Sequence, residues 1–350
     1  MAPITQVNPV HGVELFPVAE YWWFYAIFMV FVSIVVALDL GVFQKEAHQV
    51  SFREALRRTI SRILMALAFN VGFYFYLRYA LPHNERLMAL PGFDPAAVAQ
   101  ESALQFLAGY LVEQTLALDN IFVFSLVFTY FSIPGKYQAR VLLYGIFGAL
   151  LFRAIFISIG SLLMQFHWVV LAAGVFLIFT GGKMLFGGEE KIEPEKNPLI
   201  RLLRRFLPIT PGLEAEHFFV RHNNRLFGTP LLVTLIVVEA SDIVFALDSV
   251  PAIFGISSEP LIVFTSNVFA ILGLRSMYFI LADILERFHL LKYGVSLILV
   301  FVGLKMVWLN DLFGGEMPIT WSLGIIFGVL GLSIVASLVV PKKPEAEHGP

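Results

Sequence analysis

The stretch "EASDIVFALDSVPAIF" (residues 239–254) is apolar enough to lie in a lipid bilayer, yet it carries Glu239, Asp242 and Asp248. The whole chain of 350 residues is similar in character: 58% of its residues are hydrophobic and only 14% are charged. Such a composition is typical of a polytopic membrane protein and excludes a soluble enzyme. Carboxylates are costly in such a segment, so their presence there has to be explained.

Runs of about 20 mostly apolar residues are long enough to cross a bilayer as helices. They occur at 22–43, 62–81, 104–132, 141–164, 168–187, 229–254, 261–286, 293–310 and 318–340. The sequence therefore predicts an all-α polytopic membrane protein with about nine transmembrane helices. Because they carry several charges, 104–132 and 229–254 are the spans that hydropathy alone would most easily miss.

The basic residues predict an orientation, since lysine and arginine accumulate in the cytoplasmic loops of membrane proteins. Those outside the expected spans lie almost entirely on alternate connections, whereas the opposite connections hold only Arg86. We therefore expect the N-terminus outside and the C-terminus in the cytoplasm.

Two parts of the chain repeat each other. An offset of 122 positions superposes Arg153 on Arg275, together with a Phe-His pair and a Lys-Met pair. An offset of 129 positions superposes Glu113 on Asp242 and Asn120 on Ser249, and it aligns two Ala-Leu-Asp triplets. The matched features include charged residues, which apolar composition alone would not align.

The repeat divides the chain into five parts. They are an N-terminal segment with two transmembrane helices (1–103), a first three-helix repeat (104–187), a cytoplasmic loop (188–228), a second three-helix repeat (229–310), and a last transmembrane helix with a cytoplasmic tail (311–350). Because three is odd, the second repeat must cross the membrane in the opposite sense. Inverted repeats of this kind are common in transporters, whose substrate site lies near the midplane between the repeats.

Five carboxylates lie within the two spans that carry the Ala-Leu-Asp triplets, namely Glu113, Asp119, Glu239, Asp242 and Asp248. One Asp near the bilayer centre costs about 2.5–3.5 kcal/mol on insertion scales. Protonation, ion pairing or a bound cation can offset that cost. Arg153 and Arg275 can pair with two carboxylates but cannot neutralise all five. The surplus acid therefore predicts a cation or proton site.

The available ligands indicate which cation this site would prefer. The carboxylates, Asn120, Ser249 and backbone carbonyls form an all-oxygen set, which suits Mn²⁺, Mg²⁺ or Ca²⁺. The chain has no cysteine, so disulfides and thiolate metal sites are excluded. Asp39, in a third Ala-Leu-Asp triplet, lies near the cytoplasmic end of the first span, where a vestibule or capping role is favoured over a central ligand.

Spacing leaves two arrangements open. Residues six apart point about 120° apart on a straight helix, so Glu113 and Asp119 would not hold one ion from one face, and neither would Asp242 and Asp248. Each pair either marks successive stations on a pathway or lies on an interrupted helix. Pro251 favours interruption in the second repeat.

The stretches "GYLVEQTLALDNIFVFSLVFTYFSIP" (109–134) and "VVEASDIVFALDSVPAIF" (237–254) closely resemble the TerC family, and its Alx-type bacterial members in particular. "TSNVFAILGLRSMYF" (265–279) extends the match. The resemblance implies a nine-helix protein of the bacterial inner membrane, related to cation exporters of the lysine-exporter superfamily. It also implies links to manganese export and to tellurium resistance.

On this resemblance we expect a transporter with Mn²⁺ as transported substrate rather than fixed cofactor, working by alternating access. Asp119 and Asp248 would approach each other across the pseudo-twofold axis, with Glu113, Glu239 and Asp242 completing the site. Coupling to protons is left open, as is homo-oligomerisation. The expected partners are the lipid bilayer and the metal cation, with no nucleic acid and no obligate protein partner.

A second interpretation is a membrane-bound redox or metal-stress modulator that transports nothing. The lack of cysteine, of haem-type histidine pairs in the spans and of a nucleotide-binding glycine loop argues against it. A third interpretation is a scaffold in a metal-stress complex. The acids are not accompanied by a nucleophile or base in a known arrangement, so we expect no enzyme.

Overall fold

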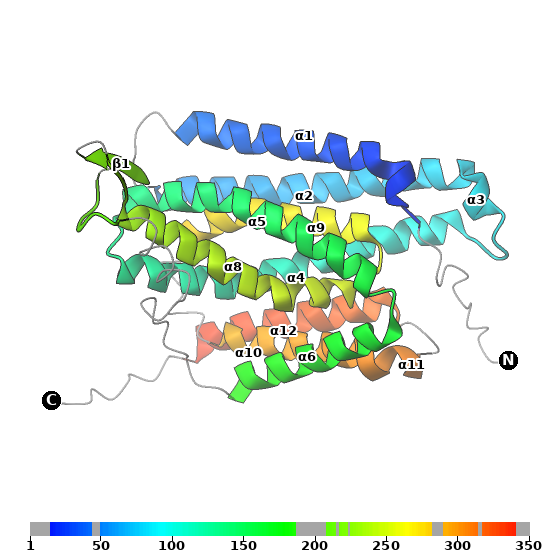
Figure 1. Cartoon of the computed structure of the whole chain (residues 1–350). Coiled ribbons are helices and arrows are strands. Elements are labelled where there is room, and N and C mark those ends of the chain that lie inside the picture. The colour runs from blue at the N-terminus through cyan, green and yellow to red at the C-terminus, as the bar shows by residue number, and fades with distance from the viewer. Residues whose placement is uncertain are drawn as a thin grey trace.

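The computed structural model describes residues 15–43, 50–186, 208–214, 217–222, 225–281, 290–313 and 317–340. Long helices run side by side along one axis, each antiparallel to the next along the chain (Figure 1). The β-hairpin and the last turns of α1 lie at one end of this bundle, and α3 lies at the other (Figure 1). The all-α polytopic fold predicted from the sequence is confirmed.

The long helices are α1 (Val18–Phe43), α2 (Phe52–Ala80), α4 (Pro95–Tyr130), α5 (Gly135–Leu163), α6 (His167–Phe186), α8 (Pro230–Phe254), α9 (Pro260–Leu281), α10 (Leu291–Leu304) and α12 (Ile319–Val339). The short helical elements are a 3₁₀ turn at Leu81–His83, α3 (Glu85–Met88), a π-helical turn at Lys305–Leu309 and α11 (Asn310–Leu312). Strands β1 (Phe219–His222) and β2 (Arg225–Gly228) pair antiparallel, with Phe219 opposite Gly228.

Eight helices among the described residues are long and apolar enough to cross a membrane. The ninth span expected from the sequence corresponds to α4, in which the side chains of residues 118, 119 and 122 lie outside the described residues. Its 36 residues extend about 54 Å. It runs alongside the other helices (Figure 1).

Two local features differ from the sequence expectation. Helix α2 begins at Phe52, ten residues before the expected span, because Ser51 caps it by accepting a hydrogen bond from the Glu54 N–H. The expected spans put Arg58 in the loop before this helix, whereas the structure places it on the first turns of the helix. The β-hairpin lies in the segment expected to be a cytoplasmic loop, and no strand was predicted there.

Helix α9 is the centre of the bundle. Its most apolar window is 89% buried, whereas no other candidate span exceeds 44%. It packs against α2, α4 and α5. A helix shielded from lipid on nearly all sides can carry polar residues at membrane depth, because they face protein rather than hydrocarbon.

The six helices of the two expected repeats pack crosswise. Helix α4 contacts α8 and α9, α5 also contacts α8 and α9, and α6 contacts α10. The α6–α10 contact is close because glycines lie in it: a Cβ added to Gly303 would lie 2.6 Å from the Gly174 carbonyl oxygen. Exchanging α4 with α8, α5 with α9 and α6 with α10 maps these contacts onto each other. The inverted repeat stays a prediction that this pattern fits.

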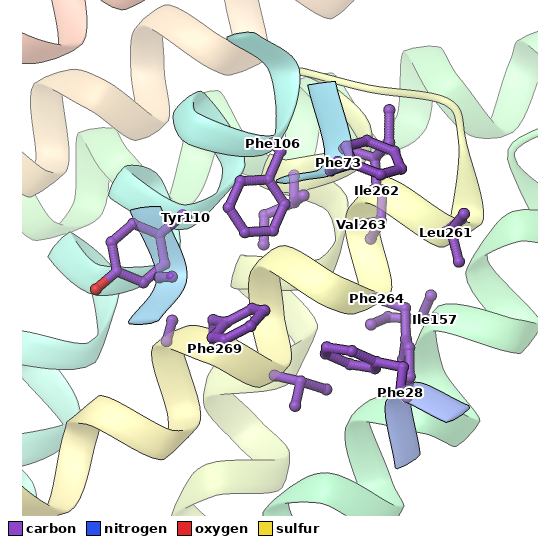
Figure 2. Packing of buried hydrophobic residues seen from close by; sticks show 14 of the residues in the cluster. Phe28, Phe73, Phe106, Tyr110, Ile157, Leu261, Ile262, Val263, Phe264 and Phe269 are labelled. Carbon is purple, nitrogen blue, oxygen red and sulfur yellow. The ribbon is translucent and has the colours of Figure 1, made fainter. Parts of the chain in front are cut away.

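Aromatic side chains fasten the first two helices to the repeats. Phe28 of α1 lies 6.0 Å from Phe264 and 5.6 Å from Phe269 between ring centroids, and Phe106 of α4 lies 6.0 Å from Phe269 (Figure 2). Phe73 of α2 belongs to the same buried cluster. The α1–α2 pair therefore shares a core with α4 and α9.

A buried carboxylate holds the start of α1. Glu259, in the turn before α9, is only 7% exposed. The backbone N–H groups of Leu15 and Phe16 donate hydrogen bonds to its two oxygens at 2.8 and 3.3 Å. A carboxylate at the N-terminus of a helix also interacts favourably with the helix dipole.

We predict that Glu259→Ala destabilises the protein by about 2 kcal/mol, because two hydrogen bonds to a charged group are lost. Thermal unfolding of the detergent-solubilised protein would measure the loss as a melting temperature lower by a few degrees. Glu20→Ala is the matched control, since Glu20 lies on the first turn of α1 and is exposed. Equal melting temperatures for the two variants would contradict the anchoring role.

Candidate functional site

A fully buried ion pair lies between the first two helices of the first repeat. Arg153 of α5 and Glu113 of α4 are each 2% exposed, and Nη1 of Arg153 pairs with Oε1 of Glu113. The same Nη1 donates a hydrogen bond to Oδ1 of Asn267 on α9. The ion pair expected for Arg153 thus forms, and Asn267 joins the central helix to it.

The second repeat contributes Asp242 to the same place. Asp242 is buried on α8 and accepts a hydrogen bond of 3.3 Å from Nδ2 of Asn120 on α4. It is close enough to Glu113 and to Arg153 for their charges to interact. Two carboxylates and one guanidinium from α4, α5 and α8 therefore share one buried volume.

The contacts across this centre are reciprocal. Glu113 lies beside Ser249, and Asp242 is bonded to Asn120. The sequence repeat superposes Glu113 on Asp242 and Asn120 on Ser249, so each contact becomes the other when the repeats are exchanged. The Ser249 hydroxyl itself has no hydrogen-bond partner among the described residues.

Glu239 extends the cluster by one helical turn of α8, three residues before Asp242. Its carboxylate lies against α5, where a Cβ added to Gly148 would overlap both of its oxygens and a Cβ added to Gly145 would lie 3.3 Å from Oε1. Glycine at 148 therefore makes the room for this carboxylate. Oε2 of Glu239 is buried and has no hydrogen-bond partner in the described part of the chain.

A cavity adjoins these acids. Its polar lining is Glu239, Asp242 and Arg275, and its apolar lining includes Phe124, Leu142 and Ala149. We call it the acid cavity, and we call the set Glu113, Asn120, Arg153, Glu239, Asp242 and Ser249 the acid cluster. Arg275, predicted from the sequence as an ion-pair partner of the acids, is placed at the edge of this cavity.

A second cavity lies toward the hairpin end of the bundle, between α1, α2 and α9. We call it the vestibule. Its lining includes Asp39, Val50, Arg58, Arg62, Arg275 and Ser276. Asp39 pairs with Arg62 at 2.5 Å and lies outside the acid cluster. The vestibule or capping role expected for Asp39 from the sequence stays a prediction.

Two of the acids expected to be central are not brought into the acid cluster by the described side chains. Asp248 is partly exposed on α8 and interacts with Thr180 of α6. Asp119 lies in α4, but its side chain falls outside the described residues. The expected approach of Asp119 to Asp248 therefore stays a prediction.

The acid cluster is not a preformed metal cage. Within the described ranges, no three Asp, Glu or His side chains are grouped closely enough to hold a metal ion. Glu113 is instead engaged by Arg153. In this arrangement a buried carboxylate can be neutralised by an arginine or by a proton. Enclosing a cation would require a rearrangement of these side chains or further ligands.

Sequence reasoning missed Gly148 and Asn267. A glycine in an apolar helix is common, and nothing in the local sequence shows that a carboxylate of another helix packs on it. Asn267 had a weak signal, because it is an amide within an apolar run of "TSNVFAILGLRSMYF" and such residues usually find a partner across helices.

Comparison with known proteins gives a consistent result. Residues 98–345 match the model of the "Integral membrane protein TerC family". The chain is 45% identical over 338 residues to "Uncharacterized membrane protein STKORF319" of Myxococcus xanthus, covering 96% of this chain and 97% of that protein. It is 43% identical over 324 residues to "Putative membrane-bound redox modulator Alx" of Escherichia coli strain K12, covering 92% and 96%. No solved structure matches.

The buried ion pair gives a stability prediction. Glu113→Gln and Arg153→Gln should each lower the free energy of unfolding by about 3–5 kcal/mol, because each leaves an uncompensated charge in the core. The double variant should lose clearly less than the sum, since neither charge then remains. Unfolding of the four proteins in detergent measures this coupling. Additive losses would show that the two side chains do not act as a pair.

Proposed function

The chain belongs to the integral membrane protein TerC family, and from this premise we propose that it is a divalent-cation transporter of the bacterial inner membrane. Its proposed activity is export of Mn²⁺ from the cytoplasm by alternating access through the acid cluster. The observation that carries the proposal is that Glu239 and Asp242 line a cavity in the core of the bundle and that Glu113 is close enough to Asp242 for their charges to interact.

Charge supports a cation as cargo. Glu113 and Asp242 share a low-dielectric core in which Arg153 is already paired with Glu113, and Glu239 lies one helical turn from Asp242. Oε2 of Glu239 and Oε2 of Glu113 lack hydrogen-bond partners in the described part of the chain. Buried carboxylate oxygens of this kind are stabilised by a cation or by a proton. A cation pathway would bring either a cation or a proton to these oxygens.

The chemistry of the donors supports a hard cation. Carboxylates with Asn120 and Ser249 form an oxygen set suited to Mn²⁺, Mg²⁺ or Ca²⁺. The choice of Mn²⁺ among these rests on the family resemblance. The ion is cargo in this proposal, so a site that is assembled in one conformation and dispersed in another is what alternating access requires.

In this mechanism Arg153 neutralises Glu113 when no cargo is bound. An arriving cation competes with the guanidinium for that carboxylate and draws Asp242 and Glu239 toward it. Asp119 and Asp248 complete the ligand set or receive the ion at the next station. After the ion leaves, the vacated acids take up protons, which provides the coupling step.

The basic residues support a direction for the chain in the membrane. Among the described helices, the first turns of α2 and α5 carry Arg53, Arg57, Lys136 and Arg140, and all lie at the hairpin end of the bundle (Figure 1). We assign this end to the cytoplasm. The N-terminus is then outside and the C-terminus is cytoplasmic.

The rival function is a membrane-bound redox or metal-stress modulator, including a role in tellurium resistance, without transport. The names of several relatives favour it. The chain has no cysteine, so thiol–disulfide exchange by its own side chains is excluded. The two functions differ in whether purified protein moves an ion.

We predict that proteoliposomes containing the wild-type protein transport Mn²⁺ and that Asp242→Asn reduces the rate at least tenfold. Loss of one charge removes both a cation ligand and the partner of Asn120. Asp119→Asn and Asp248→Asn should also reduce the rate. Flux is followed with a Mn²⁺-quenched dye, with Ca²⁺ and Mg²⁺ as competing ions.

Asp311→Asn is the matched control, because Asp311 lies on α11, is exposed and is not part of the acid cluster. It should transport at the wild-type rate. If the folded wild-type protein moves none of the three ions, or if Asp242→Asn transports normally, the transport function is wrong and the modulator is favoured.

A second prediction uses the glycine that makes room for Glu239. Gly148→Ala should push the carboxylate away from α5 and reduce Mn²⁺ flux severalfold, with little loss of stability, because the end of a Glu side chain can move. Gly72→Ala on α2 is the control, since a Cβ there would meet nothing within 4 Å. Equal flux in the two variants would remove Glu239 from the pathway.

A further inference from the structure

One arginine lines both cavities. Arg275 lies on the central helix α9, is 6% exposed, and belongs to the lining of the acid cavity and to the lining of the vestibule. No other residue is shared by these two linings. Arg275 therefore lies where the two cavities approach each other.

Position along the helices places Arg275 on one side of the acid cluster and Arg153 on the other. Arg275 is six residues, or about 9 Å, from the end of α9 at the hairpin side. Arg153 is ten residues, or about 15 Å, from the opposite end of α5. The sequence repeat superposes these two arginines, so each repeat contributes one guanidinium to one side of the acids.

A guanidinium in this place has two effects on a cation. When it faces the acid cavity, whose lining it shares with Glu239 and Asp242, its positive charge reduces the cost of two buried acids. It also repels a cation that approaches the acid cavity from the vestibule, because Arg275 belongs to the linings of both cavities. An ion can pass from one to the other only if Arg275 moves.

The vestibule contains a carboxylate toward which Arg275 can move. Asp39 interacts electrostatically with Arg275 and is paired with Arg62. An acid on each side gives the guanidinium two favourable positions, one near Glu239 and Asp242 and one near Asp39. A side chain with two such positions can open and close without leaving a buried charge uncompensated.

We propose that Arg275 is the cytoplasmic gate of the acid cavity, a tethered cation that cargo must displace to pass between the vestibule and the acids. This inference rests on the proposed function for the identity of the cargo. The gate controls whether molecules in the vestibule can reach the acid cavity. That access can be measured without measuring transport.

The lack of cysteine allows a direct test, since a single introduced thiol has no competitor. Ala149→Cys places a thiol in the acid cavity, and Val50→Cys places one in the vestibule. A membrane-impermeant methanethiosulfonate is applied to the cytoplasmic face of inside-out vesicles containing the full chain. The rate of modification is measured for each thiol with Arg275 intact and with Arg275→Gln.

We expect Val50→Cys to react rapidly in both backgrounds. Ala149→Cys should react slowly with Arg275 intact and at least tenfold faster with Arg275→Gln. Arg58→Gln is the matched control, because Arg58 lines only the vestibule, and it should leave the slow rate unchanged. Arg275→Lys keeps the charge on a smaller head group and should give an intermediate rate.

The gate is wrong if Ala149→Cys reacts rapidly while Arg275 is intact, or if Arg275→Gln and Arg275→Lys both leave its rate unchanged. It is also wrong as a cytoplasmic gate if Val50→Cys reacts only from the opposite face. Should Arg275→Gln fail to fold, the rate with Arg275→Lys decides in the same way. Mn²⁺ flux in the same vesicles separates the two proposals. If the modification rate of Ala149→Cys depends on Arg275 but no Mn²⁺ flux is seen, the gate is supported and Mn²⁺ as the cargo is wrong.

Discussion

The structure depends on the cost of placing carboxylates inside a membrane. Glu113 is tolerated because Arg153 reaches it from α5, and Arg153 is in turn held by Asn267 of α9. Asn120 ties α4 to Asp242 of α8. Four helices from two distant parts of the chain are thus joined by polar contacts at one buried point. Apolar packing alone would not specify that point, since lipid competes equally well for apolar side chains.

The fold could be predicted from the sequence because its determinants are local. Runs of apolar residues identify the spans, and the polar residues within α4 mark it as a candidate functional helix. The start of α2 was missed because its arginines suggested a loop, whereas Ser51 and Glu54 begin a helix there. The hairpin at 219–228 was missed because it lies in a segment whose charge pattern predicted only its side of the membrane.

The candidate site could be predicted only in part because it depends on contacts between helices. The sequence identified the acids, their repeat and Arg153 as a partner. It could not show which acid of each six-residue pair faces the centre, and there Glu113 and Asp242 meet across the repeats while Asp248 lies toward Thr180. The room that Gly148 makes for Glu239 is likewise a property of two helices and not of either sequence segment.

Charge balance links the acid cluster to the two arginines that flank it. Glu113, Glu239 and Asp242 with Arg153 and Arg275 carry a net charge of about −1 when all are ionised, so entry of a divalent cation would leave about +1 in a low-dielectric core. Such an excess is costly, and a guanidinium that withdraws toward Asp39 relieves it. When the ion leaves, the cluster again carries an excess of negative charge. Return of the guanidinium or uptake of protons neutralises that excess. Movement of an arginine and movement of the cargo are therefore two parts of one electrostatic cycle.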